Sequence, residues 1–211
     1  MYVNCQDEFL GEVLLTASAK QTMFWEGQDS AYIFQLRSGI VRGVTISEDG
    51  ERQILAFFFA GDHIGLPITQ SYRFSAEAVT DVTYVRQTRG HWNYALAESC
   101  LKDGSMLRCI GAEQDPIYRR GMLLGRQGAV TRMAAFLCSI IDRLPQDGVQ
   151  FDLPISQQDI ADYLALTPET VCRSLKRLKQ SDIIAMPAHN RLVIHDRDAL
   201  ERAAQSRATC S

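Results

Sequence analysis

The stretch ISQQDIADYLALTPETVCRSLKRL, residues 155–178, carries the signals of two consecutive short helices. Ser156 has a side chain suited to an N-cap, and Asp159 occupies the third helical position after it. Thr167 begins the second helix in the same way, with Pro168 at the first helical position, where a missing N–H does no harm. Two short helices joined by a tight turn predict a helix-turn-helix.

The second of these helices divides into two faces. Apolar residues recur at i, i+4 and i+7 and are expected to face inward: Val171, Leu175 and Leu178. The opposite stripe contains Glu169, Cys172, Arg173 and Lys176. A charged helix of this size fits the major groove of DNA. An ordinary solvated charged helix is the alternative.

The exposed stripe has side chains that can read base edges. Arg173 has the fork geometry that binds guanine O6 and N7, and Glu169 can accept from cytosine N4. Such a bidentate pair contributes about 1–3 kcal/mol of discrimination. Cys172 is small enough to contact a thymine methyl group. We therefore expect these three residues to read bases.

The same region is locally basic. Residues 167–191 contain five Lys or Arg and two acidic residues, although the whole chain has a formal net charge of -3. The segment IIAMPAHNRLVIHD, residues 183–196, predicts two strands around a polar turn, a wing beside the helix pair. The residues expected to contact the DNA backbone are Thr167, Lys176, Arg177, Lys179 and Arg191.

Residues 31–85 have a different pattern, in which short apolar runs alternate with turn residues. This pattern predicts strands. Gly39, Gly50 and Gly61 lie at equal intervals in turn contexts, where a positive φ ends one strand before the next begins. The spacing favours a small antiparallel sandwich or barrel, and three coincidental loop glycines are the alternative.

Helical patterns follow residue 88. Residues 101–125 carry an apolar seam in steps of three, four and seven, made by Leu107, Ile110, Ile117 and Leu124. We interpret this seam as a dimer interface; packing on the chain's own sandwich is the alternative. Pro116 predicts a kink or break between Gln114 and Ile117. Residues 131–144 then form an amphipathic helix that opens a second domain.

The composition bounds the class of protein. The chain has 211 residues, 46% hydrophobic and 22% charged, as expected of a soluble globular protein with two domains. The longest apolar run, residues 54–60, is too short to span a bilayer, and no N-terminal signal is visible, so we expect a cytoplasmic protein without membrane contact. Six scattered cysteines without a Cys-x-x-Cys pair favour reduced thiols and no metal site. No nucleophile–base–orienter set stands out, so we expect no catalytic residues and no enzyme.

Three segments carry a resemblance to a known family: GDHIG (61–65), RMAAFL (132–137) and DIADYLALTPETVCRSLKRL (159–178). The chain resembles regulators of the CRP/FNR superfamily, most closely its FixK-type branch. The resemblance implies an α+β fold with an N-terminal antiparallel, jelly-roll-like β-roll sensor domain (1–99), a dimerisation helix (100–125) and a C-terminal winged helix-turn-helix (126–211). The family's Glu-x-x-Ser-Arg motif matches Glu169, Cys172 and Arg173, with cysteine in place of serine.

The resemblance also implies a function. Homodimers of such regulators bind pseudo-palindromic double-stranded DNA at TTGA-like inverted repeats, contact RNA polymerase and act as activators. For the FixK branch the regulated genes concern low oxygen, nitrogen fixation or denitrification. These properties are expectations for this chain.

The sequence departs from the effector-binding members of the family. A cyclic-AMP receptor has a glutamate soon after GDxIG and an Arg-Ser pair; here Leu66 follows Gly65 and Phe74 precedes Ser75. Strand alternation is expected to turn Arg73 to the other face. An iron–sulfur cluster needs four thiolates, and only Cys5 lies near the N-terminus. We therefore expect no cofactor, with an unidentified small-molecule ligand in the β-roll as the alternative.

Cys172 lies beside Arg173 and near Lys176 on the exposed stripe. Oxidation would place bulk, and eventually negative charge, against DNA. We hypothesise that Cys172 makes DNA binding redox-sensitive. A tolerated small residue without a regulatory role is the alternative.

Overall fold

The computed structural model describes residues 13–66, 69–102, 105–144, 146–147, 150–188 and 190–205. The chain divides into two compact units, Met1–Tyr118 and Arg119–Ser211. The division falls inside the segment 100–125 that the sequence predicts as the dimerisation helix.

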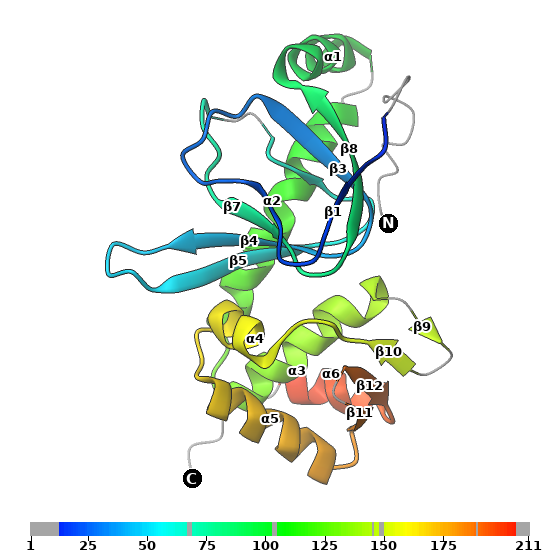
Figure 1. Ribbon diagram of the computed structural model, residues 1–211. Coiled ribbons are helices and arrows are strands. Elements are labelled where there is room, and N and C mark those ends of the chain that lie inside the picture. Colours follow the sequence, from blue (N-terminus) through cyan, green and yellow to red (C-terminus); the bar gives the residue numbers. More distant parts are fainter. Residues whose placement is uncertain are drawn as a thin grey trace. The chain divides into compact units, whose positions relative to one another are not determined.

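The described residues of the first unit form two four-stranded antiparallel sheets (Figure 1). One sheet has the strand order β1 (Leu15–Ala17), β8 (Val82–Thr88), β3 (Tyr32–Ser38), β6 (His63–Ile64). The other has the order β2 (Thr22–Phe24), β7 (Ser75–Ala78), β4 (Val41–Ile46), β5 (Arg52–Phe58). The antiparallel strands that the sequence predicts are therefore confirmed.

The turn glycines adopt the expected conformation. Gly39, Gly50 and Gly61 have φ values of 85°, 80° and 91°. At Gly39 a Cβ atom would also lie 2.3 Å from the carbonyl oxygen of Asp81, so a side chain does not fit there. The equal spacing of these glycines thus marks real strand ends.

Aromatic side chains fill the space between the two sheets. Phe24 and Tyr72 stack with ring centroids 3.9 Å apart, and Phe58 and Phe74 stack at 5.7 Å. All four rings are buried, in a cluster that also contains Phe34. Aromatic pairs of this kind add to the stabilisation from burial alone.

Two helices follow the sheets, α1 (Arg89–Lys102) and α2 (Ser105–Leu124). Helix α2 runs through Pro116 without interruption, so the predicted break is wrong. An interior proline removes one intrahelical hydrogen bond and its ring crowds the preceding turn, but it does not end α2 here. Ile110 packs against the small cluster around Trp92 of α1, and Ile117 against the aromatic cluster.

The second unit begins within α2 and continues with helices and a small sheet (Figure 1). Its helices are α3 (Ala129–Ile140), the 3-10 helix η1 (Ile141–Arg143), α4 (Gln157–Leu164), α5 (Pro168–Gln180) and α6 (Arg197–Gln205). The described strands form one sheet in the order β11 (Ile184–Ala188), β12 (Arg191–Ile194), β10 (Gln150–Asp152), β9 (Gln146–Asp147). Strands β11 and β12 are antiparallel and form the predicted wing.

Within the second unit, arginine side chains donate hydrogen bonds to backbone carbonyl groups at helix ends. The Nε of Arg120 donates to the carbonyl oxygen of Tyr163 over 2.9 Å, and Nη1 of Arg132 donates to that of Leu164 over 3.4 Å. Both acceptors belong to the last turn of α4, whose carbonyl groups lack intrahelical partners. Arg126 makes the same kind of bond to the carbonyl oxygen of Ala204 at the end of α6. The first two contacts hold the end of α4, and the third holds the end of α6.

Among the described residues no helix is both long and apolar enough to cross a membrane. Within the same residues, the His, Cys, Asp and Glu side chains form no group of three that could hold a metal ion.

Candidate nucleic-acid interface

Helices α4 and α5 form a helix-turn-helix with the predicted caps. The Oγ of Ser156 accepts from the backbone N–H of Asp159 over 3.0 Å, and Oγ1 of Thr167 accepts from that of Thr170 over 3.3 Å. Between the helices, Ala165 takes the left-handed conformation with φ 51° and closes the turn. The cap predictions are therefore confirmed.

The two faces of α5 are also as predicted. The inward residues Val171, Leu175 and Leu178 are 0%, 4% and 2% exposed. The residues on the outward side are exposed: Glu169, Cys172, Arg173, Lys176, Arg177 and Lys179. Exposure makes these side chains available to a ligand, while their contacts with DNA stay a prediction.

Glu169 is held as an anion at the start of α5. Its own backbone N–H and the hydroxyl of Thr167 donate to the carboxylate and lower its pKa, and the charge of Arg173 acts in the same direction. An ionised carboxylate only accepts hydrogen bonds, which suits the amino group of cytosine.

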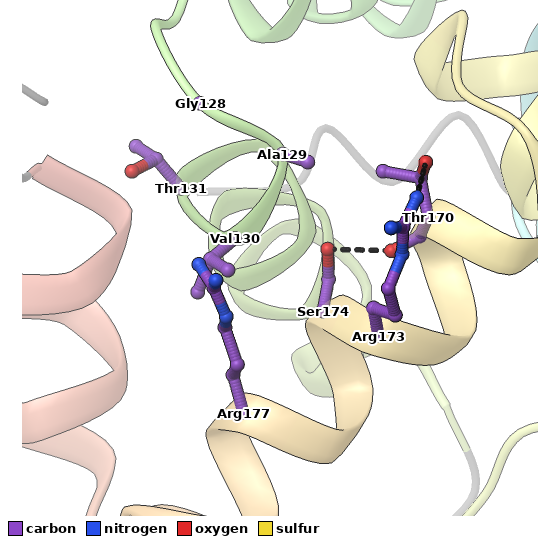
Figure 2. A pocket seen from close by; sticks show the side chains of 8 residues that line it. All are labelled: Gly128, Ala129, Val130, Thr131, Thr170, Arg173, Ser174 and Arg177. Atoms are coloured by element: carbon purple, nitrogen blue, oxygen red, sulfur yellow. Dashed lines mark hydrogen bonds between the residues drawn. The ribbon is translucent and has the colours of Figure 1, made fainter.

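A cavity of about 340 Å³ lies beside α5 (Figure 2). Its lining residues are Gly128, Ala129, Val130, Thr131, Thr170, Arg173, Ser174 and Arg177. Gly128 is the N-cap of α3, has φ 89° and offers no side-chain cap. The first N–H groups of a helix have no intrahelical partner and favour anions. The sequence gives no signal for this part of the site, because glycine lacks the capping side chain that marks a helix start.

The predicted backbone contacts differ in their surroundings. Lys176, Arg177 and Lys179 are exposed on α5, whereas the hydroxyl of Thr167 already serves as the cap of that helix. Arg191 lies on β12, where its Nε is 3.3 Å from Oδ1 of Asp152 on β10. This partner reduces the net charge that Arg191 can offer to a phosphate.

The described side chains of the predicted dimer seam are all partly buried. Ile110 and Ile117 are partly buried against their own unit, and Leu124 is also partly buried. The side chain of Leu107 lies outside the described part of the structure. Among the described side chains of α2, the large apolar ones that are exposed are Tyr118, at 69%, and Met122, at 58%, and neither belongs to the predicted seam.

Two positions at which the family resemblance leads us to expect polar groups in a cyclic-AMP receptor carry buried apolar side chains here. Leu66 is 7% exposed and packs with Ile33 and Trp92, and Phe74 is 6% exposed in the aromatic cluster. Arg73 is exposed, but it lies in a bend before β7 and not in a strand, so strand alternation does not set its direction. Nearby, burial and the charge of Arg37 lower the pKa of His63 to about 4, so this histidine is neutral at neutral pH.

Two family models match the chain. Residues 14–99 match the cyclic nucleotide-binding domain, and residues 131–203 match the Crp-like helix-turn-helix domain. The nitrogen fixation regulation protein FixK of Azorhizobium caulinodans is 36% identical over 85% of this chain and 74% of that protein. The chain belongs to the CRP/FNR family.

Two further FixK proteins are similar to this chain, one in sequence and one in structure. FixK of Rhizobium meliloti is 33% identical over 82% of this chain and 79% of that protein. The solved structure of FixK2 from Bradyrhizobium japonicum has a TM-score of 0.85 and 29% identity, covering 96% of this chain and all of that one. The α+β fold, with an antiparallel N-terminal domain and a C-terminal helix-turn-helix, is thereby confirmed. The relatives are named as regulators of transcription, not as enzymes.

Proposed function

We propose that this CRP/FNR family member is a homodimeric, sequence-specific transcription activator that reads pseudo-palindromic DNA with helix α5. The observation that carries the proposal is the exposed stripe of Glu169, Cys172 and Arg173 on a capped helix whose other face is buried. In helix-turn-helix dimers the two half-sites lie about 34 Å apart, one helical turn of DNA.

Base reading follows from the chemistry of the stripe. The guanidinium of Arg173 supplies parallel donors for guanine, and the ionised carboxylate of Glu169 accepts from cytosine. The thiol of Cys172 is exposed between them and is small enough to approach a thymine methyl group. A TTGA-like half-site presents such groups on its two strands.

The DNA backbone is expected to lie along the cations of α5 and the cavity beside it. Arg177 lines that cavity together with the first turn of α3, whose N–H groups favour a phosphate. Lys176 and Lys179 extend the basic surface, and Thr167 and Arg191 flank it. Contacts of this kind position the protein without selecting a sequence.

The names of the relatives support a role in nitrogen fixation or in fumarate and nitrate reduction. Several are nitrogen fixation regulation proteins, and the fumarate and nitrate reduction regulatory protein of Escherichia coli is 30% identical over 87% of this chain. We place the target genes in nitrogen fixation, denitrification or another low-oxygen response, with RNA polymerase as the partner of the DNA-bound dimer in the cytoplasm.

The proposed binding is tested with the full chain and a duplex carrying two TTGA-like half-sites. Its dissociation constant is compared with that of a duplex of the same composition in scrambled order. We expect the specific duplex to bind at least about 10³-fold more tightly at physiological salt. Equal binding of the two duplexes contradicts the proposal.

Oxidation of Cys172 is proposed to modulate this binding. Peroxide oxidises an accessible thiol to a sulfenic acid with release of water, and a second peroxide oxidises the sulfenic acid to a negatively charged sulfinate, again with release of water. Cys172 is exposed, whereas burial raises the pKa of Cys138 and makes it the less reactive of the two.

The oxidation test compares the natural protein with Cys172→Ser and Cys138→Ser variants. Peroxide should weaken operator binding in the natural protein and in Cys138→Ser, and should spare Cys172→Ser. Equal loss in all three proteins removes the hypothesis.

A second candidate is a regulator gated by a small molecule in the β-roll. The match of residues 14–99 to the cyclic nucleotide-binding domain favours it, and the aromatic filling of the roll opposes it. Thermal unfolding measured with and without cyclic nucleotides separates the two candidates. We expect no shift; a saturable rise in melting temperature supports the second candidate.

A further inference from the structure

Thr170 contacts the guanidinium of the arginine that we expect to read guanine. Nη2 of Arg173 donates to Oγ1 of Thr170 over 3.2 Å. Figure 2 shows the arginine directed along α5 toward Thr170, with this bond drawn. The two residues are three positions apart, a separation that makes side chains neighbours on a helix surface.

Thr170 is itself fixed by its surroundings. Its Oγ1 lies 3.0 Å from Oγ1 of Thr167, the cap of α5. Its backbone N–H donates to the same cap oxygen over 3.3 Å, and its carbonyl oxygen accepts from Oγ of the buried Ser174 over 2.8 Å. Since arginine can only donate hydrogen bonds, the Thr170 hydroxyl accepts one from Arg173. The same hydroxyl can donate a hydrogen bond to Oγ1 of Thr167. Bonds that run in one direction reinforce one another.

The hydrogen bond to Thr170 leaves enough N–H donors on Arg173 for a contact with guanine. A guanidinium has five N–H donors, and a bidentate contact with guanine uses two parallel ones. The single bond to Thr170 therefore leaves a complete fork available. An exposed arginine otherwise loses much rotamer freedom when it is ordered on a base. Because the bond to Thr170 already orders Arg173 in the free protein, less rotamer freedom is lost when DNA binds.

We propose that Thr170 is a positioning residue that orients Arg173 for guanine recognition. The inference rests on the proposed DNA-binding function and adds a residue to it. Thr170 also lines the cavity beside α5, so a direct contact with a phosphate is the competing role. A phosphate contact weakens binding to all sequences alike, whereas a positioning role acts on the preference for guanine.

The experiment measures that preference directly. Two duplexes carry the same TTGA-like inverted repeat, one with guanine and one with 7-deazaguanine, which lacks the N7 acceptor, at the half-site guanine. Dissociation constants come from fluorescence anisotropy with the full chain. The ratio of the two constants is the discrimination, which we expect to be about tenfold for the natural protein.

Four single variants and one double variant divide the possible outcomes. Thr170→Val removes the hydroxyl but keeps the branched shape and the N–H that donates to the cap, and Thr170→Ala removes it with a better helix former. Both should lower the discrimination to about threefold or less, since the arginine is no longer oriented. Thr170→Ser restores the hydroxyl and should keep the natural value. Arg173→Ala should bring the ratio close to one, and adding Thr170→Val to it should change nothing further.

Two results overturn the inference alone. One is a natural discrimination ratio in both Thr170→Val and Thr170→Ala while Arg173→Ala loses it. The other is an equal weakening of both duplexes in these variants with an unchanged ratio, which indicates a phosphate contact. If the natural protein and Arg173→Ala have the same ratio, the proposed reading of guanine by Arg173 fails, and the inference fails with it. Circular dichroism of each variant verifies that the helical content of the protein is unchanged.

Discussion

At the scale of single residues, Arg173 differs from the other cations of α5. It lies on the stripe that contains Glu169 and Cys172, and a hydrogen bond to Thr170 orients its guanidinium. Lys176 is a point charge without the planar fork that matches guanine. The two residues should therefore contribute to different properties of DNA binding.

We predict that Arg173→Ala costs about 1–3 kcal/mol on the specific duplex and removes the preference for guanine at one position of each half-site. Lys176→Ala should weaken all duplexes alike and reduce the slope of log K against log salt by about 1 per protomer. Footprinting and salt titration of both variants check this assignment. A uniform loss in Arg173→Ala contradicts it.

Residue positions on α5 followed from the sequence, but their partners did not. A helical period of 3.6 residues places Val171 inward and Glu169 outward whatever the rest of the fold. The bond between Arg173 and Thr170 depends on the rotamer of the arginine, which spacing alone does not determine. Arg191 lies opposite Asp152 because β10 and β12 pair, a contact between residues far apart in the chain.

At the scale of helices and strands, local sequence signals predicted where helices begin better than they predicted interruptions within a helix. Ser156 and Thr167 cap their helices through short-range bonds, so the sequence around them was sufficient. Pro116 predicted a kink or break, and α2 shows no break there; Ile110 and Ile117 pack within the first unit on either side of the proline. The start of α3 at Gly128 had no capping side chain to announce it.

Helix α6 is tied to the rest of its unit by an ion pair that depends on pH. Nη1 and Nη2 of Arg197 each donate to a carboxylate oxygen of Asp142, both over 2.9 Å. These bonds lower the pKa of Asp142 below its ordinary value. A lowered pKa in the folded state stabilises the protein above the ordinary value, and the contribution is lost as the pH falls through the folded-state value.

We predict that Asp142→Asn lowers the free energy of unfolding at pH 7 by about 0.2–1 kcal/mol, the range of solvent-exposed pairs. The difference from the natural protein should shrink as the pH falls below 3.8, the ordinary value for this carboxyl group. Chemical denaturation at several pH values measures it. In an Arg197→Met background the same substitution should have no effect, and an equal effect in both backgrounds rules out the pair as its cause.

At the scale of the whole molecule, the chain's division into two units followed from the sequence in outline. Regular glycines and alternating strands end near residue 88, and helical periodicity replaces them. Helical periodicity could not predict whether the apolar residues of α2 pack on a partner chain or on the same chain. A helix with one apolar face is suited to both. The structure assigns Ile110 and Ile117 in part to the first unit.

We predict that the exposed side of α2 carries the dimer contact. Tyr118→Glu and Met122→Glu should each shift the protein from dimer to monomer and weaken operator binding, because a charge is desolvated poorly in an apolar interface. Tyr94→Glu, at a tyrosine of α1 that is 67% exposed, is the matched control and should remain dimeric. Sedimentation velocity measures the states. Dimers in all four proteins, the natural one included, contradict the assignment.

The central claim is that the exposed stripe of α5 lies in the major groove with its side chains at base edges. The most direct measurement is the structure of the full chain bound to a duplex with two TTGA-like half-sites. We predict Arg173 within hydrogen-bond distance of guanine O6 or N7 and Glu169 beside the amino group of a cytosine, about 3 Å in each case. A complex in which Glu169, Cys172 and Arg173 face solvent or protein contradicts the account.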